Sequence, residues 1–248
     1  MSASRPPVMF LHSFPLDARM WSAQVEALSL DGWTCLAPDL PGFGAAPLPG
    51  PDVTPSLDVY ASAVARALEG RPPAVVVGLS LGGYVALRLL ARHPRLLRAL
   101  VLADTRAAGD PPAVKAGRIL NSSLVSRHGA AALVEKMLPA LLAPSAPASA
   151  RDRVRELGAA QRPEAIAFAL RAMRDRPDAT ELLPGVKVPT LFVVGEHDAV
   201  TPPAEHAAMA ARVPGAAVVE IAGAGHMTNL EAPEAFNRAL RGFLASLL

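Results

Sequence analysis

Residues 74–83 read AVVVGLSLGG, an apolar run that ends in the pattern G-x-S-x-G at Gly78–Gly82. The apolar part predicts a buried strand, and the residues after it have the pattern of a helix. A strand that turns sharply into a helix crowds the positions two before and two after the apex, which favours glycine at both. Ser80 at the apex would have a strained backbone and an exposed hydroxyl. The stretch therefore predicts a nucleophile at Ser80.

Five other short apolar runs predict strands, and helical segments lie between them. The other strands are expected at Val8–His12, Trp33–Pro38, Ala99–Ala103, Thr190–Gly195 and Ala217–Ile221. The helices are expected at Met20–Leu28, Ser56–Leu68, Leu81–Arg92, Pro203–Arg212 and Pro233–Leu247. The strands lack polar alternation, which indicates burial on both faces. Strands alternating with helices predict an α/β fold with a doubly wound, mainly parallel sheet of about six strands and helices on both faces.

Residues 110–184 interrupt this alternation. They have an alanine-, leucine- and arginine-rich helical pattern, cut by prolines and without a convincing strand. A structureless loop of this length inside a compact domain is improbable. We therefore expect a helical cap at 110–184, inserted after the fourth strand, with residues 1–109 and 185–248 forming the core.

Composition narrows the class of protein. The 248 residues carry a net charge of +2, and their basic residues are scattered, which argues against nucleic acid as a partner. The single cysteine, Cys35, excludes an intrachain disulfide and is expected to be a buried, inert thiol. Met1–Pro7 carries no apolar signal, which predicts a cytoplasmic protein, and Ala74–Leu90 is too interrupted to span a membrane. No metal-binding pattern such as H-E-x-x-H occurs, so we expect neither metal nor cofactor. The oligomeric state stays open.

A serine hydroxyl needs a base to take its proton, and a histidine on a loop after the last strand is the expected one. His226 lies in the sequence GAGH at Gly223–His226, directly after the last predicted strand. The glycines leave this loop free to bend. Among the other histidines, His12 is expected to hydrogen-bond the backbone of its own loop, and His206 is placed on a polar helix. His226 is therefore the predicted base.

The histidine in turn needs a carboxylate to orient it. Asp198 follows the fifth predicted strand, so the chain order is Ser80, Asp198, His226, as in folds with a G-x-S-x-G turn. Asp104 is the rival, because it follows the fourth strand and could also reach the histidine. Its alternative role is to cap a turn, and we favour Asp198.

Two backbone amides are expected to form the oxyanion hole. The N–H of Leu81 lies at the start of a helix, where free amides and the helix dipole favour negative charge. The second donor is expected in the loop Leu11–Pro15, at the N–H of Phe14. For Trp21, packing in the core is an equal alternative to a place in the acyl pocket. The residues expected to line the substrate pocket are Ser13, Trp21 and Met227.

The chain resembles the α/β-hydrolase family over nearly its whole length. The matching pieces are Leu11–Pro15, Ala37–Gly44, Gly78–Gly83, Gly195–Pro202 and Gly223–Pro233. Within that family it is similar to bacterial carboxylesterases, perhydrolases and 3-oxoadipate enol-lactonases. His12-Ser13 stands where His-Gly is common, and enol-lactonases share this serine and a pair like Met20-Trp21. Because only seven residues precede Val8, the resemblance implies six strands, without the family's antiparallel edge strand.

These residues predict a serine hydrolase that cleaves a small carboxylic ester through an acyl-enzyme. Relatives with an aspartate nucleophile, the epoxide hydrolases and haloalkane dehalogenases, are excluded by Ser80. A lactonase of the 3-oxoadipate enol-lactonase type is the alternative enzyme, because lactones and esters need the same triad. A ligand sensor that retains the triad is the alternative from a different class. In each case the expected partner is a small molecule.

Overall fold

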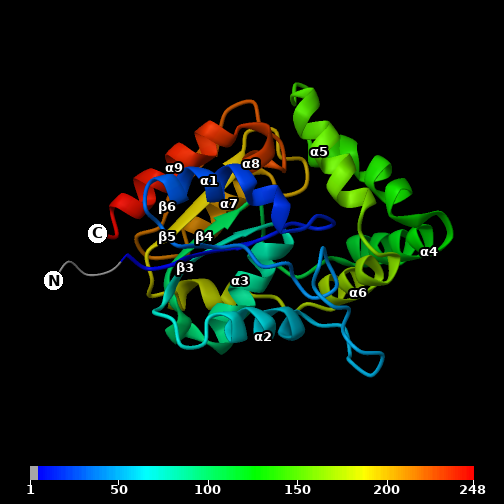
Figure 1. Ribbon diagram of the computed structural model, residues 1–248, viewed down its shortest axis with the longest axis horizontal. Coiled ribbons are helices and arrows are strands. Elements are labelled where there is room, and N and C mark those ends of the chain that lie inside the picture. Colours follow the sequence, from blue (N-terminus) through cyan, green and yellow to red (C-terminus); the bar gives the residue numbers. More distant parts are fainter. Residues whose placement is uncertain (1–4) are drawn as a thin grey trace.

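A computed structural model describes residues 5–248; residues 1–4, part of the segment Met1–Pro7 that is predicted to carry no signal, lie outside it. Six parallel strands form one sheet with the order β2-β1-β3-β4-β5-β6 (Figure 1). The strands are β1 (Val8–Leu11), β2 (Cys35–Leu36), β3 (Ala74–Leu79), β4 (Leu97–Ala103), β5 (Thr190–Gly195) and β6 (Ala217–Ile221). The predicted six-stranded parallel sheet is confirmed, and among residues 5–248 no antiparallel strand joins it.

Helices cover both faces of the sheet. The helices of the core are α1 (Ser22–Leu30), α2 (Leu57–Ala67), α3 (Leu81–Arg92), α7 (Pro203–Ala210), α8 (Thr228–Glu231) and α9 (Pro233–Ala245). Successive residues of a strand point to opposite faces, so Phe10 packs with the core beneath α1 and α9, and Met9 with the core beneath α2 and α3. Figure 1 shows α1 and α9 on one side of the sheet and α2 and α3 on the other.

The two edge strands differ from the sequence prediction. β6 is mostly exposed, with Val218 43% accessible, and β2 is only two residues long and half-buried. The prediction of burial on both faces was wrong for these two runs, because an edge strand has a neighbour on one side only. Cys35 on β2 is accordingly half-buried rather than buried, and burial raises the pKa of its thiol.

The stretch between β4 and β5 is helical, as the sequence predicts. It contains α4 (Pro112–Leu141), α5 (Ala148–Ala159) and α6 (Pro163–Arg174), which lie to one side of the sheet, at the right of Figure 1. Prolines begin α4 and α6, a position where the missing N–H costs nothing. Gly129 kinks α4 with a φ of +77°. Between residues 5 and 248, no helix combines the length and the apolar character needed to cross a membrane.

Candidate active site

Ser80 lies at the turn between β3 and α3, in the strained conformation that its sequence predicts. Its φ is +54° and its ψ is −112°, values that a residue with a side chain rarely adopts. Its amide donates to the Ala103 carbonyl at 3.0 Å. A Cβ on Gly78 would lie 2.3 Å from the Gly82 carbonyl oxygen, and one on Gly82 would lie 2.0 Å from that of Leu11. Both glycines of the pattern are therefore required by the close approach of the backbone.

The structure brings Ser80, His226 and Asp198 together from the ends of three strands. Ser80 Oγ lies 2.9 Å from His226 Nε2, and His226 Nδ1 lies 2.8 Å from Asp198 Oδ2. All three side chains are buried, with Ser80 the most accessible at 9%. An ionised carboxylate can only accept hydrogen bonds, so Nδ1 carries the proton that it donates to Asp198. In the neutral ring, Nε2 is then free to accept a proton from the serine hydroxyl.

The Asp198 carboxylate is held by its own loop as well as by the histidine. Its Oδ1 accepts from the amides of Val200 at 2.8 Å and Thr201 at 2.9 Å, and its Oδ2 accepts from Thr201 Oγ1 at 2.6 Å. Burial by itself would raise the pKa of Asp198, but His226 and the hydrogen bonds from His226 and Thr201 outweigh it and hold the pKa below its usual value. Sequence reasoning missed Thr201, although an aspartate followed closely by a threonine after a strand is typical of such a turn.

Asp104, the other candidate for the acid, is also buried near the carboxyl ends of the strands, with a φ of +44°. Its Oδ1 accepts from the Gly195 amide at 3.0 Å, and its Oδ2 accepts from Thr228 Oγ1. Burial raises the pKa of Asp104 well above its usual value, and the nearby charge of Asp198 raises it further. Asp104 thus contacts the loop next to the histidine, whereas Asp198 contacts the ring itself.

The two amides predicted to form an oxyanion hole donate no hydrogen bond to another described residue. Within residues 5–248, the N–H groups of Leu81 and Phe14 have no hydrogen-bond partner. The loop that carries Phe14 is fixed by His12, whose Nδ1 donates to the Ser13 carbonyl at 3.0 Å and whose Nε2 accepts from the Leu40 amide at 2.9 Å. Burial lowers the pKa of His12, which keeps the ring neutral and suits both bonds.

Comparison with known proteins places the chain in a family. Residues 8–239 match the alpha/beta hydrolase family. This chain belongs to the α/β-hydrolase family. It is 33% identical over 244 residues to a pimeloyl-[acyl-carrier protein] methyl ester esterase of Neisseria meningitidis, covering 96% of this chain and 93% of that protein.

Two solved structures are similar over nearly the whole α/β-hydrolase chain. A thermophilic esterase from Thermogutta terrifontis, solved with malate bound, has a TM-score of 0.92 and 35% identity, covering 98% of this chain and 91% of that one. The enol-lactonase from Burkholderia xenovorans LB400 has a TM-score of 0.86 and 27% identity, covering 98% and 92%. The named esterases among these relatives support a hydrolase that acts on small molecules.

The residues predicted to line the substrate pocket of this α/β-hydrolase are buried. Ser13, Trp21 and Met227 are each fully inaccessible. The Trp21 ring packs between Phe10 and Phe236, with ring centroids 5.1 and 5.7 Å apart. Trp21 therefore packs in the core. A role in the substrate pocket stays a prediction for all three residues.

His206 is buried, although the sequence pattern places it on a polar helix. The helix is confirmed as α7, but one of its faces packs against β5, where the buried His206 ring lies edge-on to Phe192 with centroids 6.5 Å apart. Its Nε2 accepts from the Thr105 amide at 3.1 Å, and burial lowers its pKa to about 4. His206 thus braces the turn after β4 rather than facing solvent.

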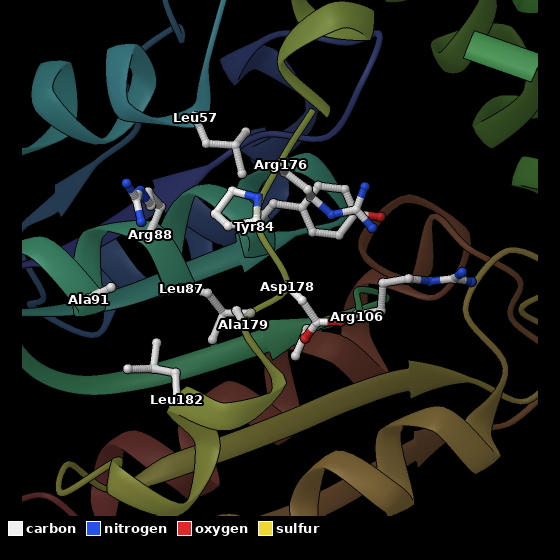
Figure 2. A pocket seen from close by; sticks show the side chains of 12 residues that line it. Leu57, Tyr84, Leu87, Arg88, Ala91, Arg106, Arg176, Asp178, Ala179 and Leu182 are labelled. Carbon is white, nitrogen blue, oxygen red and sulfur yellow. The ribbon is translucent and has the colours of Figure 1, made fainter. Parts of the chain in front are cut away.

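A cavity of about 120 Å³ lies on the flank of the α/β-hydrolase core, and no triad residue lines it. Figure 2 shows Arg176 over the Tyr84 ring, 4.1 Å from its centroid. Three arginines that line the cavity are paired within the protein: Arg176 with Asp110 at 2.5 Å, Arg88 with Asp58 at 2.8 Å and Arg106 with Glu205 at 3.2 Å. Within residues 5–248, no group of three or more His, Cys, Asp or Glu side chains is placed to hold a metal ion. The triad is therefore the candidate site.

Proposed function

We propose that this chain is a serine esterase that hydrolyses small carboxylic esters through an acyl-enzyme. The observation that carries the proposal is the buried chain of two hydrogen bonds, 2.9 Å from Ser80 Oγ to His226 Nε2 and 2.8 Å from His226 Nδ1 to Asp198 Oδ2. A nucleophile, a base and a group that orients the base, all within hydrogen-bond distance, are what acyl transfer requires.

In the proposed first half-reaction, Ser80 Oγ attacks the ester carbonyl while its proton passes to His226 Nε2. The electron pair of the carbonyl moves onto oxygen, and the amides of Leu81 and Phe14 stabilise the resulting oxyanion. When the tetrahedral intermediate collapses, the bond to the alkoxide breaks and the protonated histidine gives its proton to that alkoxide. The alcohol leaves, and the acid part of the ester stays bonded to Ser80.

In the second half-reaction, a water molecule attacks the acyl-enzyme. His226 takes a proton from the water, the same two amides hold the second oxyanion, and collapse returns the proton to Ser80 Oγ as the acid leaves. Asp198 stays ionised throughout, because its hydrogen bonds hold its pKa below the usual value. Its charge stabilises the imidazolium that forms in each half-reaction.

The names of the relatives point to more than one class of substrate. The curated relative is named as a methyl ester esterase, and a similar structure is an enol-lactonase. Simple esters are the primary proposal. A lactonase of the enol-lactonase type is the second candidate, favoured by Ser13 in the oxyanion loop and by the pair Met20-Trp21. A triad-bearing ligand sensor is the alternative outside enzymes.

A fluorophosphonate probe combined with a panel of esters and lactones tests the proposal. We expect the probe to label Ser80 alone, as read by peptide mass spectrometry, and the protein to turn over short-chain esters many times. Higher kcat/KM on lactones than on matched open-chain esters would assign a lactonase. A single slow turnover with retention of the ligand would assign a sensor, and labelling elsewhere, or none, would contradict the nucleophile.

A further inference from the structure

The buried side chain of Glu231 accepts hydrogen bonds from three backbone amides. Its Oε2 accepts from Gly225 at 3.0 Å and from Ala143 at 2.8 Å, and its Oε1 accepts from Met227 at 3.1 Å. Gly225 and Met227 are the residues on either side of His226, and Ala143 follows the last residues of α4. One carboxylate therefore joins the histidine loop to the helical insertion.

The same two segments touch directly. The amide of His226 donates to the Leu141 carbonyl, the last residue of α4, at 3.1 Å. A Cβ on Gly225 would lie 2.4 Å from the Ala143 nitrogen, so a side chain at this position would separate the segments. The Ser145 hydroxyl donates to the Gly223 carbonyl at 3.3 Å. The loop that carries the proposed base thus packs against the C-terminal end of α4 and hydrogen-bonds to it.

This loop needs such support because glycine gives its backbone unusual freedom. Gly223 has a φ of +70°, and Gly225 follows two residues later. The base must nevertheless be held within about 0.5 Å of its productive position, and a misplacement of about 1 Å costs roughly 100-fold in rate. Hydrogen bonds to a charged acceptor are stronger than neutral ones, and here two of them fix the amides that flank His226.

We propose that Glu231 is a positioning residue, which clamps the His226 loop to the C-terminal end of α4. The inference rests on the proposed function, in which His226 is the base. It implies that the position of the helical insertion and the position of the base are set together, since the carboxylate that holds the loop also holds Ala143.

Glu231→Gln tests the clamp with little change in shape. The amide of glutamine has one acceptor oxygen, and its NH2 group would face at least one backbone N–H, so at least one of the three bonds is lost. We expect kcat on a short-chain ester to fall by about tenfold or more, with KM within about threefold of wild type, because positioning acts on the transition state. The rate of fluorophosphonate labelling at Ser80 should fall by a similar factor.

Glu196→Gln is the matched control. Glu196 also accepts a backbone amide from this loop, that of Gly223 at 2.8 Å, but it is exposed and contacts neither neighbour of His226. We expect its kcat to stay within about twofold of wild type, as for most surface substitutions. Glu231→Asp keeps the charge but is one methylene shorter. Its kcat should lie between those of wild type and Glu231→Gln.

Rates are taken per labelled active site, well below the melting temperature, so that unfolded protein does not count as lost kcat. A kcat per site within twofold of wild type for Glu231→Gln, with His226→Ala inactive, would overturn the clamp and leave the proposed function standing. An equal loss in Glu196→Gln would also overturn it. Activity that survives both Ser80→Ala and His226→Ala would instead overturn the proposed function.

Discussion

The turns after β4 and β5 each carry a buried aspartate, yet the two carboxylates have different partners. Asp198 contacts the imidazole ring of His226 and the hydroxyl of Thr201. Asp104 contacts the Gly195 amide and the hydroxyl of Thr228, and so bridges neighbouring backbone segments. Both positions lie at the carboxyl ends of adjacent parallel strands, so position along the sheet does not separate them.

The pKa values of Asp104 and Asp198 are also shifted in opposite directions. Burial raises the pKa of Asp104 well above its usual value, whereas the donors around Asp198 overcome its burial and hold its pKa low. A carboxylate that orients an imidazolium must be ionised to stabilise it. Two aspartates buried at the ends of neighbouring strands thus differ in the direction of their pKa shift because different groups surround them.

Removing the proposed nucleophile should have the largest effect, because in the proposed mechanism neither aspartate can act without it. We expect Ser80→Ala to lower kcat by roughly 10⁶-fold, the size seen when a triad serine is removed. Ester hydrolysis is measured with a chromogenic substrate, and folding by circular dichroism. Activity above one per cent of wild type, with contaminating esterase excluded by active-site labelling, would show that another residue is the nucleophile.

The two aspartates are compared directly by matched substitutions. Asp198→Asn should lower kcat by roughly 10⁴-fold, because asparagine favours the wrong tautomer of the histidine. Asp104→Asn should cost about tenfold or less, because an amide can still accept from Gly195 and donate to Thr228, at the price of about one hydrogen bond. A greater loss in Asp104→Asn than in Asp198→Asn would reverse the assignment of the acid.

His206 lies beside the turn after β4 and makes that turn sensitive to acid. Its pKa is about 4 in the folded protein and about 6.5 when unfolded, so the unfolded state binds the extra proton between these values. Its contribution to stability is therefore complete above pH ~6.5 and is lost as the pH falls towards 4, by about 3 kcal/mol in all.

Urea unfolding between pH 4 and pH 7 measures this loss. The free energy of unfolding of His206→Gln should fall less steeply towards acid than that of wild type, because glutamine does not titrate. His197→Gln, which changes an exposed histidine in the same way, is the control for the substitution itself. Parallel curves for wild type and His206→Gln would show that His206 does not carry the acid sensitivity.

The smallest expected effect is on the pH dependence of catalysis. A histidine base predicts an acidic limb in kcat/KM at about pH 6–7, with a plateau on the alkaline side. Because Asp104 contacts the Gly195 amide and the Thr228 hydroxyl rather than the ring of His226, Asp104→Asn should move this limb by less than about 0.3 pH unit. A clear move of the limb to lower pH would show that the charge of Asp104 stabilises the imidazolium.

Features that depend on residues close together in the sequence were predictable from the sequence. The strained turn at Ser80 follows from the glycines two residues before and after it. A Cβ at either glycine would lie only 2.3 or 2.0 Å from a backbone oxygen. The central strands follow from unbroken apolar runs, and the order of Ser80, Asp198 and His226 follows from the order of the strands. Burial was predictable only for strands with two neighbours, so it failed at the exposed Val218 on β6.

The sequence by itself therefore determined the parallel sheet, the sharp turn at Ser80 and the candidates for base and acid, because local sterics and apolar runs specify them. Only the tertiary structure decided which aspartate meets the ring of His226, that His206 is buried, and that Glu231 holds the histidine loop. Glu231 and Ala143 are 88 residues apart, and Asp104 and Gly195 are 91 apart. Such contacts depend on which loops the folded sheet and its helical insertion bring together, and no local pattern records that.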